Sequence, residues 1–139
     1  METRIPRGVL TDIQAHAREA YPEECCGFLI GRAEGEDRTI LEHRRARNVH
    51  PEMRHARYTV DPRDVWAVAR DYRGEVEHVG FYHSHPDGAA KPSSWDLERA
   101  WRYYVYGIVA VDRDGPGEFA AWVLDEPSRT FRPVAVRIL

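Results

Sequence analysis

The fold predicted for this chain depends on one stretch of its sequence, Gly80-Phe81-Tyr82-His83-Ser84-His85-Pro86, which is followed after a polar loop by Ser93-Ser94-Trp95-Asp96. The first part is typical of a β-strand that ends at Pro86, because proline has no backbone N–H to donate. Side chains alternate between the two faces of a strand, so His83 and His85 can point the same way. Two imidazole groups would then face one point in space.

Asp96 is the natural third ligand for a metal ion at this point. Zinc suits imidazole and carboxylate ligands, and a catalytic zinc site supplies three protein ligands while leaving the fourth position for water. Simpler explanations exist for each half of the pattern. Two histidines on one strand face can be half-buried polar residues, and Ser93 with Asp96 fits a helix N-cap and an acid in the first turn.

Length and composition favour a single domain over residues 1–139, with no disulfide framework. The net charge is -3 and both signs are mixed along the chain, which gives no footprint for nucleic acid. The two cysteines, Cys25 and Cys26, favour a reducing compartment. The N-terminus has no apolar signal region and the longest apolar run is too short to cross a bilayer, so we expect a cytoplasmic protein with no membrane partner.

The periodicity predicts an α+β protein with one curved mixed β-sheet flanked by helices. We expect an edge strand at Ile5 that leads into a helix ending at Tyr21, a helix from Pro62 to Tyr72 capped by Asp61, and a helix over 94–103. Strands are expected over 25–31, 39–49, 58–60, 76–83, 105–111, 118–124 and 131–138.

Some of these elements carry more specific expectations. The polar strand over 39–49 should lie at the surface or an edge of the sheet, and the strand over 105–111 at its centre. The helix over 62–72 should bury Val65, Val68, Ala69 and Tyr72. The segment from His50 to Ala56 has no periodicity, so we predict a mobile loop whose histidines are exposed.

Taken together, His-Ser-His-Pro, six intervening residues and Ser-x-x-Asp form a far more specific pattern than either half. The pattern resembles the JAMM motif of the MPN/JAB metallopeptidases, the Mov34/PAD-1 superfamily. The resemblance covers nearly the whole chain, including the helix start at Asp61-Pro62. It implies an MPN/JAB-like fold, similar in outline to cytidine deaminase, in a small bacterial single-domain form.

By this resemblance, His83, His85 and Asp96 bind one Zn²⁺ per chain, Glu24 is the general acid/base, and the Ser93 hydroxyl stabilises a tetrahedral oxyanion. A zinc hydrolase needs a group that accepts a proton from water and later delivers one to the leaving amine. In the family, this glutamate lies three residues before a glycine at the opening of an apolar strand.

Glu24 has this position relative to Gly27, whereas its neighbour Glu23 does not. Without the rest of the motif, Glu24 would be an exposed acid between a loop and a strand. Cys25 and Cys26 lie next to this base, but a thiol nucleophile needs a depressed pKa and a base partner. On so apolar a strand we expect both thiols to be small core residues.

The resemblance implies a zinc-dependent metallopeptidase that cuts a peptide or isopeptide bond after the C-terminal Gly-Gly of a ubiquitin-like protein, a bacterial sulfur carrier. Carriers of this kind serve cysteine, thiamine or molybdopterin synthesis. The substrate tail is expected to add as a strand to a sheet edge, between loops 50–56 and 87–92. Oligomerisation is left open.

Other functions compete with this one. The first alternative is a non-catalytic MPN scaffold, which the intact ligand set disfavours, and the second is a deubiquitinase-like isopeptidase with other substrates. A zinc deaminase would need His-x-Glu and Pro-Cys-x-x-Cys signatures. The sequence contains neither.

Overall fold

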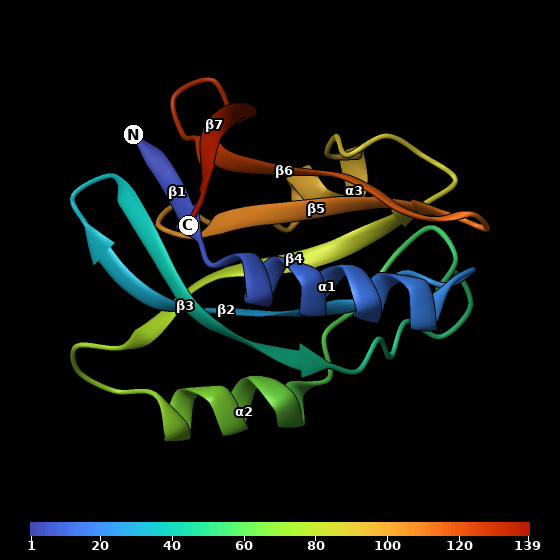
Figure 1. The fold of residues 1–139 in the computed structure, drawn as a ribbon, viewed down its shortest axis with the longest axis horizontal. Helices are drawn as coiled ribbons and strands as arrows, with labels where there is room; N and C mark the ends of the chain where they lie inside the picture. The colour runs from blue at the N-terminus through green and yellow to red at the C-terminus, as the bar shows by residue number, and fades with distance from the viewer.

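The structure, a computed structural model, describes residues 1–139 and contains seven strands and three helices (Figure 1). The strands are β1 (Glu2–Ile5), β2 (Cys26–Glu34), β3 (Asp37–Ala46), β4 (Glu77–Pro86), β5 (Val105–Asp112), β6 (Gly115–Asp125) and β7 (Thr130–Ile138). The helices are α1 (Arg7–Ala20), α2 (Pro62–Asp71) and α3 (Ser94–Glu98). None of the helices has the length and apolar composition needed to cross a membrane.

The strands form one mixed sheet that closes as a barrel in the order β1-β3-β2-β4-β5-β6-β7. The pairs β1/β3, β1/β7 and β4/β5 are parallel, and the other neighbours run antiparallel. The mixed, curved sheet confirms the main part of the predicted fold class. The expected edge position of β1 is wrong, because β1 lies between β3 and β7 and thereby closes the sheet. The polar strand β3 lies at the surface as predicted, and β1 pairs with it only at Arg38 and Thr39, so residues 40–46 also form an edge.

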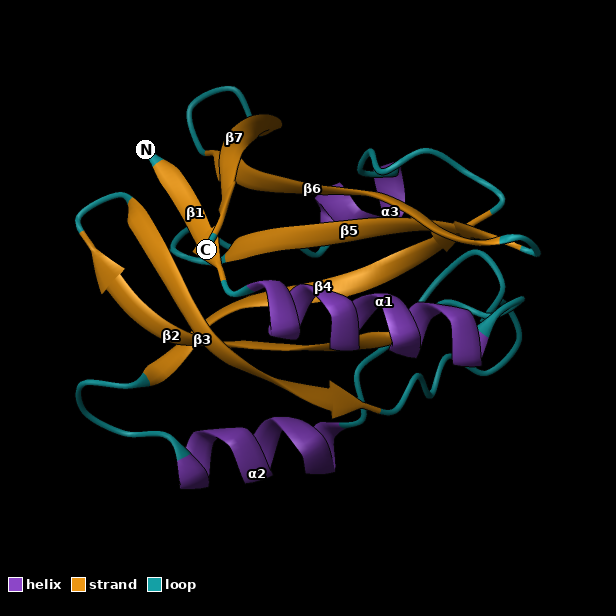
Figure 2. Ribbon diagram, in the orientation of Figure 1, coloured by secondary structure: helices purple, strands orange, loops and turns teal.

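Helix α1 packs against β3, β5 and β6 and lies across the sheet in the ribbon view (Figure 2). Its apolar face consists of Leu10, Ile13 and Ala17, which belong to the main hydrophobic core together with residues such as Leu29 and Val109. The spacing of three and four residues explains why one face is buried. Helices therefore cover only part of the barrel, so the prediction of a sheet flanked by helices is confirmed only in part.

Helix α2 begins as predicted, with the Asp61 side chain as N-cap and Pro62 in the first turn. Its buried face is narrower than expected. Val68 packs on a small cluster from β2, whereas Val65 and Ala69 are exposed. The helix contacts the sheet through a single ridge, and the periodicity of the sequence does not show how wide such a contact will be.

Helix α3 is shorter than the predicted helix over 94–103. After its last turn, the Trp101 N–H donates to the Tyr106 hydroxyl at 2.8 Å and not to a helical carbonyl. Tyr103 has a φ of 87°, in the left-handed region that ends a helix. A side chain of the following strand thus replaces the helical bond, a long-range event that helix propensity does not describe.

Candidate metal centre

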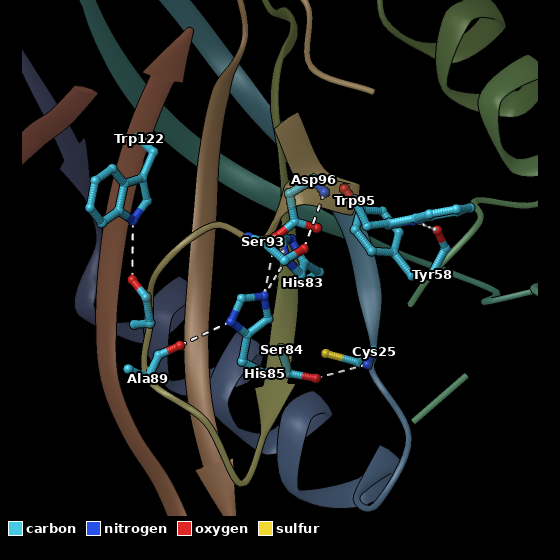
Figure 3. A network of polar contacts seen from close by, with 11 residues as sticks. Cys25, Tyr58, His83, Ser84, His85, Ala89, Ser93, Trp95, Asp96 and Trp122 are labelled. Carbon is cyan, nitrogen blue, oxygen red and sulfur yellow. Dashed lines mark hydrogen bonds and ion pairs between the residues drawn. The ribbon is translucent and has the colours of Figure 1, made fainter. Parts of the chain in front are cut away.

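Strand β4 carries His83 and His85 on the same face, as their spacing predicts. The strand lies between β2 and β5: β5 pairs with it as far as Pro86, and β2 only as far as His83. The two Nε2 atoms are 3.1 Å apart, and the rings lie close together in the close-up view (Figure 3). Two lone-pair donors thus face one point near the end of a strand whose last residues are held by β5.

Asp96 reaches the same point from α3. Its Oδ2 lies 3.1 Å from Nε2 of His83 and 3.2 Å from Nε2 of His85. A capping box fixes this carboxylate: the Ser93 N–H donates to Asp96 Oδ2 at 2.9 Å, and the Asp96 N–H donates to Ser93 Oγ at 3.2 Å. The cap and the contact with the histidines are therefore two aspects of one arrangement.

The spacing of these three donor atoms fits a zinc-sized cation. Ligands at about 2.0–2.1 Å from a tetrahedral zinc ion lie about 3.3 Å from one another. The three separations in this protein are 3.1, 3.1 and 3.2 Å. Although burial opposes it, the contact with His83 and His85 holds the pKa of the Asp96 carboxyl well below its usual range, so the donor set contains one ionised oxygen.

A main-chain contact orients the His85 ring for this purpose. Nδ1 of His85 lies 2.9 Å from the Ala89 carbonyl, which can only accept, so this nitrogen carries the proton and Nε2 keeps its lone pair. The Trp122 indole N–H donates to the next carbonyl, that of Ala90, at 3.1 Å. The loop after β4 is thus held by a tryptophan of β6 while it orients a histidine of β4.

Glu24 lies just before β2, and its side chain is buried beside the histidines. One carboxylate oxygen lies within 4.8 Å of the donor nitrogens of His83 and His85, and Oε1 has no hydrogen-bond partner. Burial, with a smaller effect of Asp96, raises the pKa of Glu24 to about 8, while His85 opposes this shift. A carboxyl group with a pKa near neutrality can both accept and deliver a proton.

The alternative of an exposed acid is wrong for Glu24, which is buried. Glu23 is exposed and forms an ion pair with Arg54 at 3.2 Å. Cys25 is buried, and burial raises the pKa of its thiol to about 11. A thiol of this pKa is a poor nucleophile. The interpretation of the cysteines as core residues is therefore confirmed.

The prediction of exposed histidines in the loop 50–56 is correct for His55 and wrong for His50. His50 is buried, and its Nδ1 accepts hydrogen bonds from the N–H groups of Glu52 and Met53 at 3.4 and 3.0 Å. Its ring therefore caps a turn. No periodicity in the sequence marks such a local bond, which depends on how the loop folds back on itself.

Two aromatic residues next to the centre were not found by sequence reasoning. The Tyr58 ring stacks on the His83 ring with centroids 4.5 Å apart, and the Trp95 indole N–H donates to the Tyr58 carbonyl at 3.2 Å. They also line an apolar pocket of about 170 Å³, together with Phe81, Trp101 and Tyr106. Asp96 lies in its wall, so the pocket adjoins the donor cluster.

Comparison with known proteins places the chain among peptidases. A family profile described as prokaryotic homologues of the JAB domain matches residues 6–125. A desampylase from Haloferax volcanii is 38% identical over 91% of this chain and 88% of its own. A probable TtuB-protein conjugate cleaving protease from Thermus thermophilus is 36% identical over 77% and 71%, and a CysO-cysteine peptidase from Mycobacterium tuberculosis is 32% identical over 72% and 66%.

Solved structures agree on the fold. A protein from Desulfitobacterium hafniense superposes with a TM-score of 0.84 at 25% identity, covering 99% of this chain and 92% of its own. A JAB1/MPN domain protein from Archaeoglobus fulgidus superposes with a TM-score of 0.56 at 19% identity, covering 99% of both chains, which concerns the fold alone. The profile match, the relatives and the fold agree, and this chain belongs to the family of prokaryotic homologues of the JAB domain.

Proposed function

We propose that this protein is a JAMM-type zinc metallopeptidase that cuts the bond after the C-terminal Gly-Gly of a ubiquitin-like sulfur carrier. The observation that carries the proposal is the convergence of His83, His85 and Asp96 within 3.2 Å of one another, beside the buried carboxyl group of Glu24. Relatives named as a desampylase, a TtuB-conjugate protease and a CysO-cysteine peptidase support the substrate class.

In this proposal His83, His85 and Asp96 hold one Zn²⁺ per chain. When bound, zinc supplies a Lewis acid that polarises the scissile carbonyl and makes water nucleophilic near neutral pH. The two histidines bind through Nε2, because Nδ1 of His85 is engaged by Ala89 and the Nε2 atoms face the cluster. The capping box keeps the Asp96 carboxylate in place, so little side-chain freedom is lost on metal binding.

Glu24 acts on the protons of the reaction. Its carboxylate accepts the proton of the attacking water and delivers it to the leaving nitrogen, which otherwise departs as a poor leaving group. No side chain of the protein competes for Oε1, which is buried without a partner. The Glu24 carboxyl group is therefore free to exchange a proton with the reacting atoms.

Ser93 stabilises the charge that develops on the carbonyl oxygen. Its Oγ accepts the Asp96 N–H, which leaves the hydroxyl hydrogen free to donate to an oxyanion. Ser93 is exposed and begins α3, so its hydroxyl faces solvent beside the donor cluster. The N-cap role fixes its direction without occupying the hydrogen.

The substrate tail is still expected to add as a strand near the centre, between loops 50–56 and 87–92. Although the sheet closes as a barrel, β2 pairs with β4 only as far as His83, so the strand end that carries His85 has no ladder partner on that side. The pocket of about 170 Å³ beside Asp96 is large enough for one apolar side chain of the tail. Glycine at the scissile bond lets the tail backbone approach the cluster closely, because it has no side chain.

The test is mass spectrometry of a ubiquitin-fold carrier that bears one extra residue after Gly-Gly. Wild-type protein should release that residue, whereas Glu24→Gln should not, and unfolded casein should stay intact in both reactions. Cutting of casein as fast as the carrier would contradict the proposed selectivity. Release of the residue by Glu24→Gln at the wild-type rate would contradict the proposed mechanism.

A further inference from the structure

Asn48 uses the full hydrogen-bonding capacity of its carboxamide on the main chain. Nδ2 donates to the carbonyls of Glu24 and Arg57 at 3.0 and 3.1 Å. Oδ1 accepts the N–H groups of His50 and Thr59, both at 3.1 Å. A carboxamide offers two donor hydrogens and two acceptor lone pairs, so none is left unused. The partners also fix which way the group points, since carbonyls face one side and N–H groups the other.

These four bonds connect the two halves of the candidate centre. One bond holds the main chain of Glu24, the residue that carries the buried carboxyl group. Two others hold Arg57 and Thr59, the residues on either side of Tyr58. The Tyr58 ring in turn stacks on His83 at 4.5 Å. One side chain therefore joins the base to the segment that covers a histidine of the donor cluster.

Regular structure does not supply this connection. Beyond β3, the segment that contains Asn48 has only an isolated bridge between Asn48 and Val60, with two main-chain bonds: Val49 N–H to the Thr59 carbonyl and Asp61 N–H to the Arg47 carbonyl. The Glu24 N–H is held from the same region, by the Arg54 carbonyl. In an irregular loop, a side chain must provide the bonds that a sheet ladder provides elsewhere.

We propose that Asn48 is a positioning residue that sets the place of the Glu24 carboxyl group relative to the histidines. The inference rests on the proposed function, since it assigns Glu24 the proton transfer. Asn48 touches no substrate and acts through the Glu24 main chain. A misplacement of a catalytic group by about 1 Å can reduce an enzymatic rate by about 10²-fold. The hydrogen bonds of Asn48, here called the brace, therefore affect turnover by holding Glu24 in place.

Two substitutions separate the contributions of the carboxamide. Asn48→Ala removes all four bonds, and Asn48→Asp keeps the shape but places a carboxylate oxygen against the carbonyls of Glu24 and Arg57. We expect both to lower kcat by about 10- to 100-fold with KM changed less than about threefold, because Asn48 itself does not line the pocket beside Asp96. Zinc content should stay at the wild-type level.

The first test does not depend on activity. The chain contains one asparagine and one glutamine, Gln14, so the side-chain carboxamide region of a ¹H–¹⁵N spectrum contains two NH₂ pairs. The Asn48 pair, assigned by its loss in Asn48→Asp, should exchange with D₂O more slowly than the Gln14 pair. Equal exchange rates would overturn the proposal, because the bonds to Glu24 and Arg57 would then not persist in solution.

The second test is a double-mutant cycle on the carrier substrate, with single-turnover rates measured at excess enzyme. If Asn48 acts through Glu24, then Asn48→Ala should lower the rate in the wild-type background and leave it unchanged in Glu24→Gln. Equal losses in both backgrounds would overturn the proposal. Val134→Ala, in the core on β7, is the control for destabilisation alone: a lower Tm with the wild-type rate is expected.

The proposal would also be overturned if the Asn48→Ala variant behaved like this control, with a lower Tm and the wild-type rate. If wild-type protein cleaves no carrier at all, the proposed function fails by itself. The exchange rates of the Asn48 and Gln14 pairs then still decide whether the brace exists.

Discussion

Ser93 and Asp96 hold each other through reciprocal hydrogen bonds of 2.9 and 3.2 Å, and the same Asp96 carboxylate faces two histidine nitrogens on β4. The first turn of α3 thus fixes a donor atom against a strand that lies 11 to 13 residues earlier in the chain. A change in either residue is therefore expected to affect the metal, the helix or both.

The metal should be lost when one donor is removed. We expect about one zinc per chain in the wild type and far less in His83→Ala or Asp96→Ala, since two remaining protein ligands bind the ion weakly. Elemental analysis after dialysis against a weak chelator is the measurement. His55→Ala, at an exposed loop histidine, is the control and should keep its zinc. Full zinc in the His83 and Asp96 variants would show that the ligands are others.

Glu24→Gln should keep its zinc and lose turnover by about 10²- to 10⁴-fold, because the amide cannot accept a proton from water. The matched control is Glu23→Gln. Glu23 is exposed and contacts only Arg54, so its rate should stay within about twofold of the wild type. The reverse result, an active Glu24 variant and an inactive Glu23 variant, would mean that the register of the motif is wrong.

Ser93→Ala should lower the rate by about 10²- to 10³-fold, the usual effect of removing one oxyanion donor, while zinc content falls much less. The substitution also removes the N-cap of α3, so the melting temperature has to be measured beside the rate. Ser94→Ala is the control, because Ser94 is exposed and follows the cap. If the lower melting temperature accounts for the whole loss of rate, then Ser93 caps the helix and has no role in stabilising the oxyanion.

The stability of the protein should decrease as pH falls from about 6.5 to about 4. Burial lowers the pKa of His16 and of His78 from 6.5 to about 4, with Arg45 adding to the shift at His16. In the unfolded chain both histidines take up protons near pH 6.5, so unfolding becomes more favourable below that pH. The contribution is complete above pH 6.5 and is lost as pH approaches 4.

Urea unfolding of the metal-free protein at pH 7.0, 5.5 and 4.5 measures this dependence. His78→Phe, in an aromatic environment that includes Phe28, Phe81 and Tyr104, should show a weaker decrease than the wild type. His55→Ala should show the wild-type decrease, since its side chain is exposed. An unchanged slope in His78→Phe would contradict the assignment.

The apolar pocket beside Asp96 should contribute to substrate binding. Trp101 lines it and is 69% exposed, so Trp101→Ala should raise KM about tenfold, or about 1.4 kcal/mol, with little change in kcat. Trp66→Ala on α2 is the matched control, a tryptophan that is 78% exposed and outside the pocket. Equal KM values for the two variants would exclude the pocket from the substrate site.

Local patterns predicted the parts of the fold that depend on neighbours in sequence. The alternation along β4 placed His83 and His85 on one face, and Asp61-Pro62 marked the start of α2. Predictions that depended on distant partners were less successful. The start of the chain suggested an edge strand at Ile5, but β1 pairs with both β3 and β7 and closes the barrel. The strands at the two termini pair through main-chain groups. Because every residue type except proline offers the same groups, the sequence does not show which strands will pair.

Local spacing alone placed His83 and His85 on one strand face and Ser93 with Asp96 in one helix cap, because strand faces and caps have fixed spacings. How these side chains are surrounded depends on the tertiary fold. Glu24 is buried, with its N–H held by the Arg54 carbonyl from a distant loop, and this burial raises its pKa to about 8. Burial and a brace such as Asn48 arise from contacts between segments far apart in the chain, and such contacts leave no periodic mark in the sequence.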